Sequence, residues 1–150
     1  MKANHYRKFA LMLALSFVIM YAVMYLNVYQ ADHIYLSMTR FYMTLLMICP
    51  MALVMLIAMR SMYKNKTVNT IIVVCSIAVF GLALAGVRTQ TLVGDVQYMK
   101  GMIPHHSIAI MTSTRADIKD PEVKKLSQGI IEAQEREIAE MKRILARMDK

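Results

Sequence analysis

Long apolar runs fill the first part of the chain, and mixed apolar and polar positions fill the rest. Three runs contain no charged residue: Phe9–Tyr29, Phe41–Met59 and Val68–Val87. Each is long enough to cross a hydrocarbon core about 30 Å thick, since a helix rises about 1.5 Å per residue. We therefore expect three transmembrane helices, at about residues 9–29, 41–59 and 68–87.

From residue 94 onward, apolar residues recur at intervals of three and four among charged ones, which predicts two amphipathic helices. The first begins at Gly94-Asp95 and ends at about Arg115. Asp120-Pro121-Glu122 begins the second, because Asp caps free backbone amides, Pro suits the first helical position and Glu complements the helix dipole. This helix runs to about Arg147, and its apolar stripe consists of Val123, Ile130, Ile138, Met141, Leu145 and Met148.

The predicted fold class is all-α, with two domains. Residues 1–88 are expected to form a membrane domain with three spans, and residues 89–150 a helical hairpin outside the cytoplasm. Composition agrees with a membrane protein, because 57% of the residues are hydrophobic, against roughly 45–50% in soluble domains. The lipid bilayer is thus the first expected partner.

The net charge of +8 does not indicate a nucleic-acid-binding protein, because the basic residues flank the apolar runs. Lys2, Arg7 and Lys8 precede the first run, and further basic residues lie in the loop Arg60–Lys66. Basic residues beside a span mark its cytoplasmic end. We expect a bacterial inner (plasma) membrane protein with a cytoplasmic N-terminus, a hairpin in the periplasm or outside the cell, and no nucleic-acid partner.

The first run is interpreted as a membrane anchor and not as a cleaved signal peptide. Its 21 residues exceed the usual apolar region of a signal peptide, roughly 7–15 residues. Tyr21, Tyr25 and Tyr29 near its outer end suit the membrane interface. His33, in the loop that follows, is expected to be solvated or interfacial.

The second run carries a methionine every four residues, which forms a slowly drifting ridge on one side of a helix. One interpretation is a thioether path for Cu(I) beside Cys49-Pro50; the simpler one is lipid contact and helix packing by a flexible side chain. Cys49 and Cys75 both fall inside spans, so no disulfide framework is expected outside the membrane. The ridge consists of Met43, Met47, Met51, Met55 and Met59.

Soft and borderline metal ligands crowd into the stretch between residues 99 and 111. Methionine selects Cu(I), and imidazole accepts Cu(I), Cu(II) and zinc, so copper is the expected metal and zinc is possible. On a straight helix at about 100° per residue, one face of about 80° gathers the side chains that matter. They are Asp95, Met99, Met102, His106, Ala109 and Ser113, with His105 and Tyr98 on the shoulder.

On the second amphipathic helix, Gln134, Glu137 and Met141 stand at positions expected to face inward. An unpaired buried polar group costs roughly 1–3 kcal/mol, so these side chains need partners. A turn near residues 117–120 sets His106 level with Gln134, Met102 with Glu137, and Asp95 and Met99 with Met141. The two helices are thus expected to aim sulfur, imidazole and carboxylate at one small volume.

These residues resemble the DUF305 family over about residues 94–146. The resemblance rests on Met102-Ile-Pro-His-His106, Asp95, the Asp-Pro-Glu-Val sequence at 120–123 and Gln134-xx-Glu137-Ile138-xx-Met141. It implies a ferritin-like helical domain, usually extracytoplasmic, with members linked to copper binding and copper tolerance. The metal ligands that it implies here are Met102, His105, His106, Gln134, Glu137 and Met141.

The chain departs from the family pattern at Thr112, where methionine is common. Met111 stands one place early and points to the opposite face of a straight helix. We therefore do not expect Met111 to bind metal.

A hairpin of about 55 residues is too small to bury its own apolar stripe well. We expect two chains to pair their hairpins into a ferritin-like four-helix bundle, as a homodimer or a higher homo-oligomer.

The leading hypothesis is a membrane-tethered copper-binding protein that sequesters copper or hands it to a copper chaperone or exporter. A ferritin-like metal oxidase is an alternative, although that class uses about four carboxylates and Glu-x-x-His pairs, and the inward face offers Asp95 and Glu137 without such a pair. A membrane interaction protein without a metal is the third hypothesis.

Overall fold

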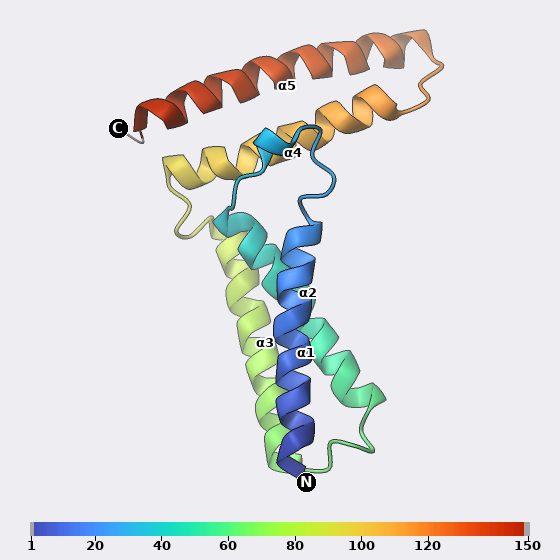
Figure 1. Cartoon of the computed structure of the whole chain (residues 1–150), viewed down its shortest axis with the longest axis vertical. Coiled ribbons are helices and arrows are strands. Elements are labelled where there is room, and N and C mark those ends of the chain that lie inside the picture. The colour runs from blue at the N-terminus through green and yellow to red at the C-terminus, as the bar shows by residue number, and fades with distance from the viewer. Residues whose placement is uncertain (1, 149–150) are drawn as a thin grey trace. The chain divides into compact units, whose positions relative to one another are not determined.

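The computed structural model describes residues 2–148, and every regular element in that range is helical (Figure 1). This confirms the all-α prediction. Clustering of the backbone divides the chain into two compact units: Met1–Val23 with Thr39–Leu92, and Met24–Met38 with the chain from Val93 onward. The helices in chain order are α1 (Lys2–Val23), the short 3-10 helix η1 (Ala31–His33), α2 (Met38–Ala58), α3 (Lys66–Thr89), α4 (Asp95–Arg115) and α5 (Pro121–Met148).

The first unit contains the helices that are long and apolar enough to cross a membrane, namely His5–Val23, Met38–Ala58 and Lys66–Thr89. The second and third agree with the predicted spans to within a few residues. The first ends at Val23 and not at Tyr29, as the apolar run had predicted. The apolar run misleads here because residues from Met24 onward leave the helix and belong to the second unit.

In the first unit, a side-chain cap fixes the start of α3, and close packing brings α3 against α2. Asn65 begins α3 by accepting the backbone N–H of Val68 at 3.2 Å through its side chain. At Gly86 the two helices α2 and α3 come so near that an added Cβ would lie 3.1 Å from the ring of Tyr42. A small residue lets the helix backbone approach the ring. The core of this unit consists of Phe9, Ala52, Leu56 and Tyr63.

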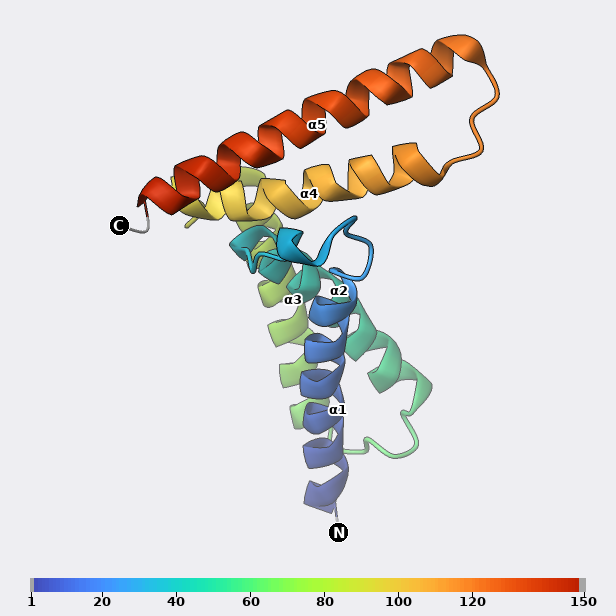
Figure 2. The same ribbon diagram turned by 45° about the horizontal axis from the view of Figure 1, so that its top comes forward.

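In the second unit, α4 and α5 run antiparallel as a hairpin, as both views show (Figures 1 and 2). The predicted start of α5 is confirmed, because Oδ1 of Asp120 accepts the backbone N–H groups of Glu122 and Val123 at 2.9 and 3.0 Å. The hairpin core consists of Met99, Ile103, Ile110, Ile138 and Leu145, and Tyr35 of the loop Met24–Met38 packs against it.

The predicted apolar stripe of α5 is only half right. Ile138 and Leu145 are buried, together with Ser127, and face α4. Val123 is 48% exposed, and Ile130 and Met148 are exposed as well. The burial centres on the line through Ser127, Ile138 and Leu145, so the side of α5 that carries Val123 and Ile130 is left open.

Candidate metal centre

A hollow of about 470 Å³ lies between α4 and α5 near the start of α4 and the end of α5. Most of the predicted site residues meet there: Asp95, Met99, Met102, His106, Glu137 and Met141. Tyr98, Glu140, Ile144, Arg147 and Met148 also line it. The sequence reasoning missed these α5 residues as site residues, although Glu140, Ile144 and Met148 follow Glu137 at helical intervals of three and four, which is the signal that would have found them.

His106 is the central polar group of this hollow. Its Nδ1 is the single buried side-chain nitrogen or oxygen atom, in the part of the chain that the structure describes, with no hydrogen-bond partner. Oε2 of Glu137 lies 3.2 Å away, within ion-pair distance but without the alignment of a hydrogen bond. Buried polar atoms are almost always paired, so an orphaned one indicates a missing ligand or a functional role.

Burial also sets the charge of His106. Desolvation lowers the pKa of the ring below its ordinary value, and the Glu137 carboxylate opposes this shift. At neutral pH the imidazole is therefore uncharged. A neutral imidazole is the form that binds metals.

The thioethers of the hollow also belong partly to the hairpin core. Met99 is buried in that core, and Met141 packs against it while both line the hollow. Their positions follow from helical spacing, because Met99, Met102 and His106 lie three and four residues apart on one side of α4. The core role thus fixes Met99 and Met141 as walls of the hollow that His106 also lines.

His105 and Gln134 do not take the predicted places. His105 is exposed and does not line the hollow; its ring centroid lies 6.1 Å from that of His106. Gln134 is half-buried and lines a separate depression on α5 beside Leu126 and Ile130. Met111 does not line the hollow either, as expected.

His106 meets Glu137 and not Gln134, the residue expected to lie level with it. Long side chains on a helix lean toward the N-terminus of that helix. In an antiparallel pair, His106 and Glu137 therefore lean toward each other even though their Cα atoms are not level.

Among the described residues, no group of three or more His, Cys, Asp or Glu side chains stands close enough to hold a metal ion. The hollow is lined by one imidazole, His106, by the carboxylates of Asp95, Glu137 and Glu140, and by methionine thioethers; of the carboxylates, Glu137 forms an ion pair with the imidazole. The donor set fits a soft ion such as Cu(I) and does not fit a carboxylate-bridged di-metal centre.

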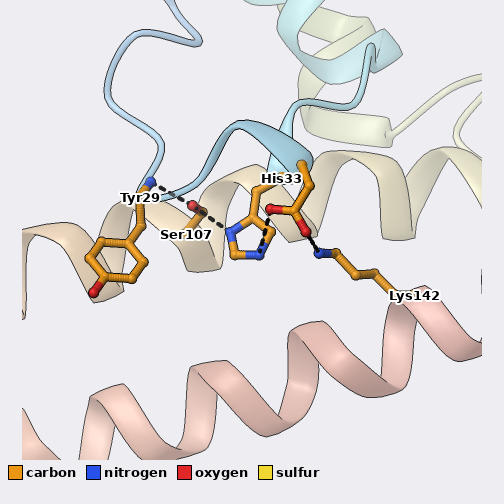
Figure 3. A network of polar contacts seen from close by, with 5 residues as sticks. Tyr29, His33, Ser107 and Lys142 are labelled. Atoms are coloured by element: carbon orange, nitrogen blue, oxygen red, sulfur yellow. Dashed lines mark hydrogen bonds and ion pairs between the residues drawn. The ribbon is translucent and has the colours of Figure 1, made fainter.

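The other side of the hairpin carries a polar network that the sequence did not reveal (Figure 3). The hydroxyl of Ser107 accepts the backbone N–H of Tyr29 at 2.7 Å and lies 2.9 Å from Nδ1 of His33. Lys142 of α5 donates to the carboxylate of Asp32 at 2.5 Å. The loop Met24–Met38 is thus bonded to both helices of the hairpin.

This network corrects three predictions. His33 is 6% exposed and not solvated. Tyr25 is buried, and its hydroxyl donates to the carbonyl oxygen of Tyr35 at 2.9 Å. The backbone N–H of Tyr29 bonds to Ser107, so both tyrosines lie in the loop after α1 and not on the predicted spanning helix. The cause is tertiary contact with the hairpin, which a local apolar pattern does not reveal.

The pKa values in this network follow from its contacts. The hydrogen bond from Lys142 lowers the pKa of Asp32, and burial lowers the pKa of His33. The tautomer of the neutral His33 ring sets the direction of the hydrogen bond between its Nδ1 and the Ser107 hydroxyl, because that oxygen has a second lone pair besides the one that accepts from Tyr29.

Ser107, His33 and Asp32 resemble a Ser-His-Asp triad in order only. The Ser107 side chain is fully buried, so no substrate reaches its oxygen. Nε2 of His33 lies 3.7 Å from Asp32, too far for a hydrogen bond. The network therefore has the features of a structural clamp and not of a catalytic centre.

Known proteins are similar to this chain both in the hairpin and in the helices before it. The sequence model of DUF305, described as a domain of unknown function, matches residues 85–150. The uncharacterized protein L153 of Acanthamoeba polyphaga mimivirus is 38% identical over 138 residues, which cover 90% of this chain and 89% of the relative. That similarity extends beyond the hairpin into the helices that are long and apolar enough to cross a membrane. No solved structure matches the chain. The protein is a member of the DUF305 family.

Proposed function

We propose that this protein is a membrane-tethered copper-binding protein that sequesters copper or hands it on to a chaperone or exporter. The observation that carries the proposal is the orphaned Nδ1 of His106, which lies in a hollow lined by methionine thioethers. A bound soft metal ion would satisfy that nitrogen.

The donor chemistry favours Cu(I) over the other candidates. Met99, Met102 and Met141 supply soft sulfur, and His106 supplies a neutral nitrogen. Zinc is usually held by Cys, His and carboxylate ligands, so it is the weaker candidate here. Oε2 of Glu137 lies 3.2 Å from the same Nδ1 atom, so the carboxylate stands where it would act as a further ligand of the ion.

The membrane orientation is part of the proposal. Lys2, Arg7 and Lys8 at the start of α1 and the basic residues between α2 and α3 support a cytoplasmic N-terminus. With three spans, the hairpin would then face the periplasm or the cell exterior. Copper bound there would be held outside the cytoplasm of a bacterial cell.

Pairing between chains is also proposed, as a ferritin-like four-helix bundle built from two hairpins. Two helices cannot enclose an apolar stripe, and large apolar side chains of α5 such as Val123 and Leu126 stand exposed.

The test is a Cu(I) titration of the full-length protein in detergent, in competition with a chromophoric Cu(I) chelator. We expect His106→Ala to weaken Cu(I) binding at least about a hundredfold, because it removes the one imidazole of the hollow. The matched control is His105→Ala, which removes the exposed neighbouring ring and should leave the affinity within about threefold.

A second pair of variants tests the thioethers in the same titration. Met102→Leu removes a sulfur atom from the hollow, and Met111→Leu removes one that lies outside it. Equal affinities for these two variants, or an unchanged affinity of His106→Ala, would refute the proposal.

A further inference from the structure

The two sides of the α4–α5 hairpin are unequally covered. The loop Met24–Met38 occupies one side through the bonds of Ser107 and Lys142. On the other side, Leu126 is 64% exposed and Val123 is 48% exposed. A row of large exposed apolar side chains on an otherwise charged helix marks an interaction surface.

The exposed row continues into the candidate metal centre. At about 100° per residue, Val123, Leu126, Ile130 and Ala133 share an arc of about 80° with Glu137, Met141, Ile144 and Met148. We call this arc the open stripe of α5. Lys142, which bonds to the loop, lies about 140° away from its centre. The open stripe therefore faces away from the loop and includes the lining of the hollow.

Charges along the outer edge of the open stripe are self-complementary. In chain order that edge reads Glu122, Lys125, Glu132, Arg136, Glu140, Arg143 and Arg147. If a copy of α5 lies antiparallel across it, with a two-fold axis between residues 133 and 134, most of the facing charges are opposite in sign. Glu132 faces Arg136 of the copy, Glu122 lies between Arg143 and Arg147 of the copy, and Lys125 lies between Glu140 and Arg143 of the copy.

From this charge pattern we infer that the open stripe binds a second copy of the same hairpin, antiparallel, with the two-fold axis at Ala133 and Gln134. The inference specifies the face and the register of the dimer proposed above. It rests on that dimer and does not depend on copper binding. The residues nearest the axis suit close approach, because Ala133 is small and a Cβ at Gly129 would meet nothing within 4 Å.

The second copy also closes the metal centre. In this register Leu126 of the copy faces Met141, and Val123 of the copy faces Ile144. Both Met141 and Ile144 line the hollow. Each hairpin thus places its exposed apolar row over the hollow of the other. The pairing removes the exposed apolar row and the open side of the hollow from water together. Two isologous contacts of this kind close a dimer and leave no surface for further growth.

Disulfide cross-linking of the full-length protein in its membrane, with a metal chelator present, tests the register. Ala133→Cys places its thiol beside the two-fold axis, so oxidation with diamide should link most chains as dimers. Glu135→Cys, at the same height on the opposite side of α5, should stay monomeric. The parent protein with Cys49 and Cys75 gives the baseline. Dimers from Glu135→Cys, or none from Ala133→Cys, would overturn the inference.

A mixed pair tests which residues cover the hollow. Co-expression of Val123→Cys with Ile144→Cys should give a heterodimeric disulfide. Each variant expressed alone should give little. Absence of the mixed dimer overturns the register.

Charge reversal gives a test that needs no new thiol. Glu132→Lys should raise the dimer dissociation constant about tenfold, since it turns two attractions to Arg136 into two repulsions. Adding Arg136→Glu should restore it. Glu135→Lys, the same charge change on the opposite side of α5, should have no effect. If the double variant does not recover the dissociation constant of the parent protein, the antiparallel register is contradicted. A Cu(I) titration of the same variants tests the proposed function independently of the register.

Discussion

The two sides of the hairpin each hold a shielded histidine, the buried His33 and the half-buried His106, and the two rings differ in what they meet. On the loop side, the ring of His33 is bonded to Ser107, and Ser107 is bonded in turn to Tyr29. On the open side, Nδ1 of His106 finds no hydrogen-bond partner among the described residues. The protein thus pairs Nδ1 of His33 and leaves Nδ1 of His106 available.

This difference separates a structural histidine from a ligand candidate. Burial lowers the pKa of both rings, so both are neutral at pH 7 and burial alone does not distinguish them. Their hydrogen bonds do. A buried polar group that the fold leaves unpaired costs stability, and proteins keep such groups where a ligand or a reaction uses them.

The largest expected effect falls on the loop side. Ser107→Ala leaves the N–H of Tyr29 and Nδ1 of His33 without their shared partner, and should destabilise the hairpin unit by about 2–4 kcal/mol. Amide hydrogen exchange of α4 in the full-length protein measures this as faster opening. Thr112→Ala is the control, because the exposed Thr112 hydroxyl bonds only to carbonyls of its own helix. If both variants speed the opening of α4 equally, the Ser107 hydroxyl does not hold the loop to the hairpin.

Acid should weaken the hairpin through both histidines. Because the folded-state pKa of each ring lies below the unfolded value of about 6.5, the unfolded chain binds more protons below that pH. Stability is therefore fully present above about pH 6.5 and falls as the pH drops through that value. Hydrogen exchange at pH 7.5 and 5.0, corrected for the intrinsic exchange rate, should show the loss, and His33→Gln should reduce it. A hairpin that becomes more stable in acid contradicts the assigned direction.

The ion pair between Lys142 and Asp32 should matter less. The Asp32 side chain is 65% exposed, so solvent screens the pair. Lys142→Ala should cost less than about 1 kcal/mol by hydrogen exchange, and added salt should shrink the difference. A cost as large as that of Ser107→Ala would mean that the clamp depends on charge and not on the buried hydroxyl.

The smallest effect is expected on the open side in the absence of metal. His106→Leu removes an unsatisfied nitrogen and keeps apolar volume, so the hairpin should change in stability by no more than about 1 kcal/mol in either direction. Hydrogen exchange in the presence of a chelator is the measurement. A loss of several kcal/mol would show that His106 is a structural residue like His33.

Local sequence patterns predict the helices and the α4 side of the candidate metal centre. Charge-free runs give α2 and α3, and the cap at Asp120 gives the start of α5 because a carboxylate accepts the free amides of the first turn. Helical spacing alone brings Met99, Met102 and His106 to one side of α4.

Contacts between distant residues set the rest. His33 and Ser107 are 74 residues apart in the chain, so no local pattern reveals that the loop clamps the hairpin. The exposed position of His105 and the meeting of His106 with Glu137 depend on how the side chains of two helices lean, which helical spacing does not specify.

X-ray absorption at the copper edge tests the central claim most directly, on the full-length protein loaded with one equivalent of Cu(I). The account predicts a mixed environment of sulfur and one imidazole nitrogen. The nitrogen contribution should disappear in His106→Ala and persist in His33→Ala. A spectrum without sulfur, or one that His106→Ala leaves unchanged, would contradict the assignment of this hollow as the copper site.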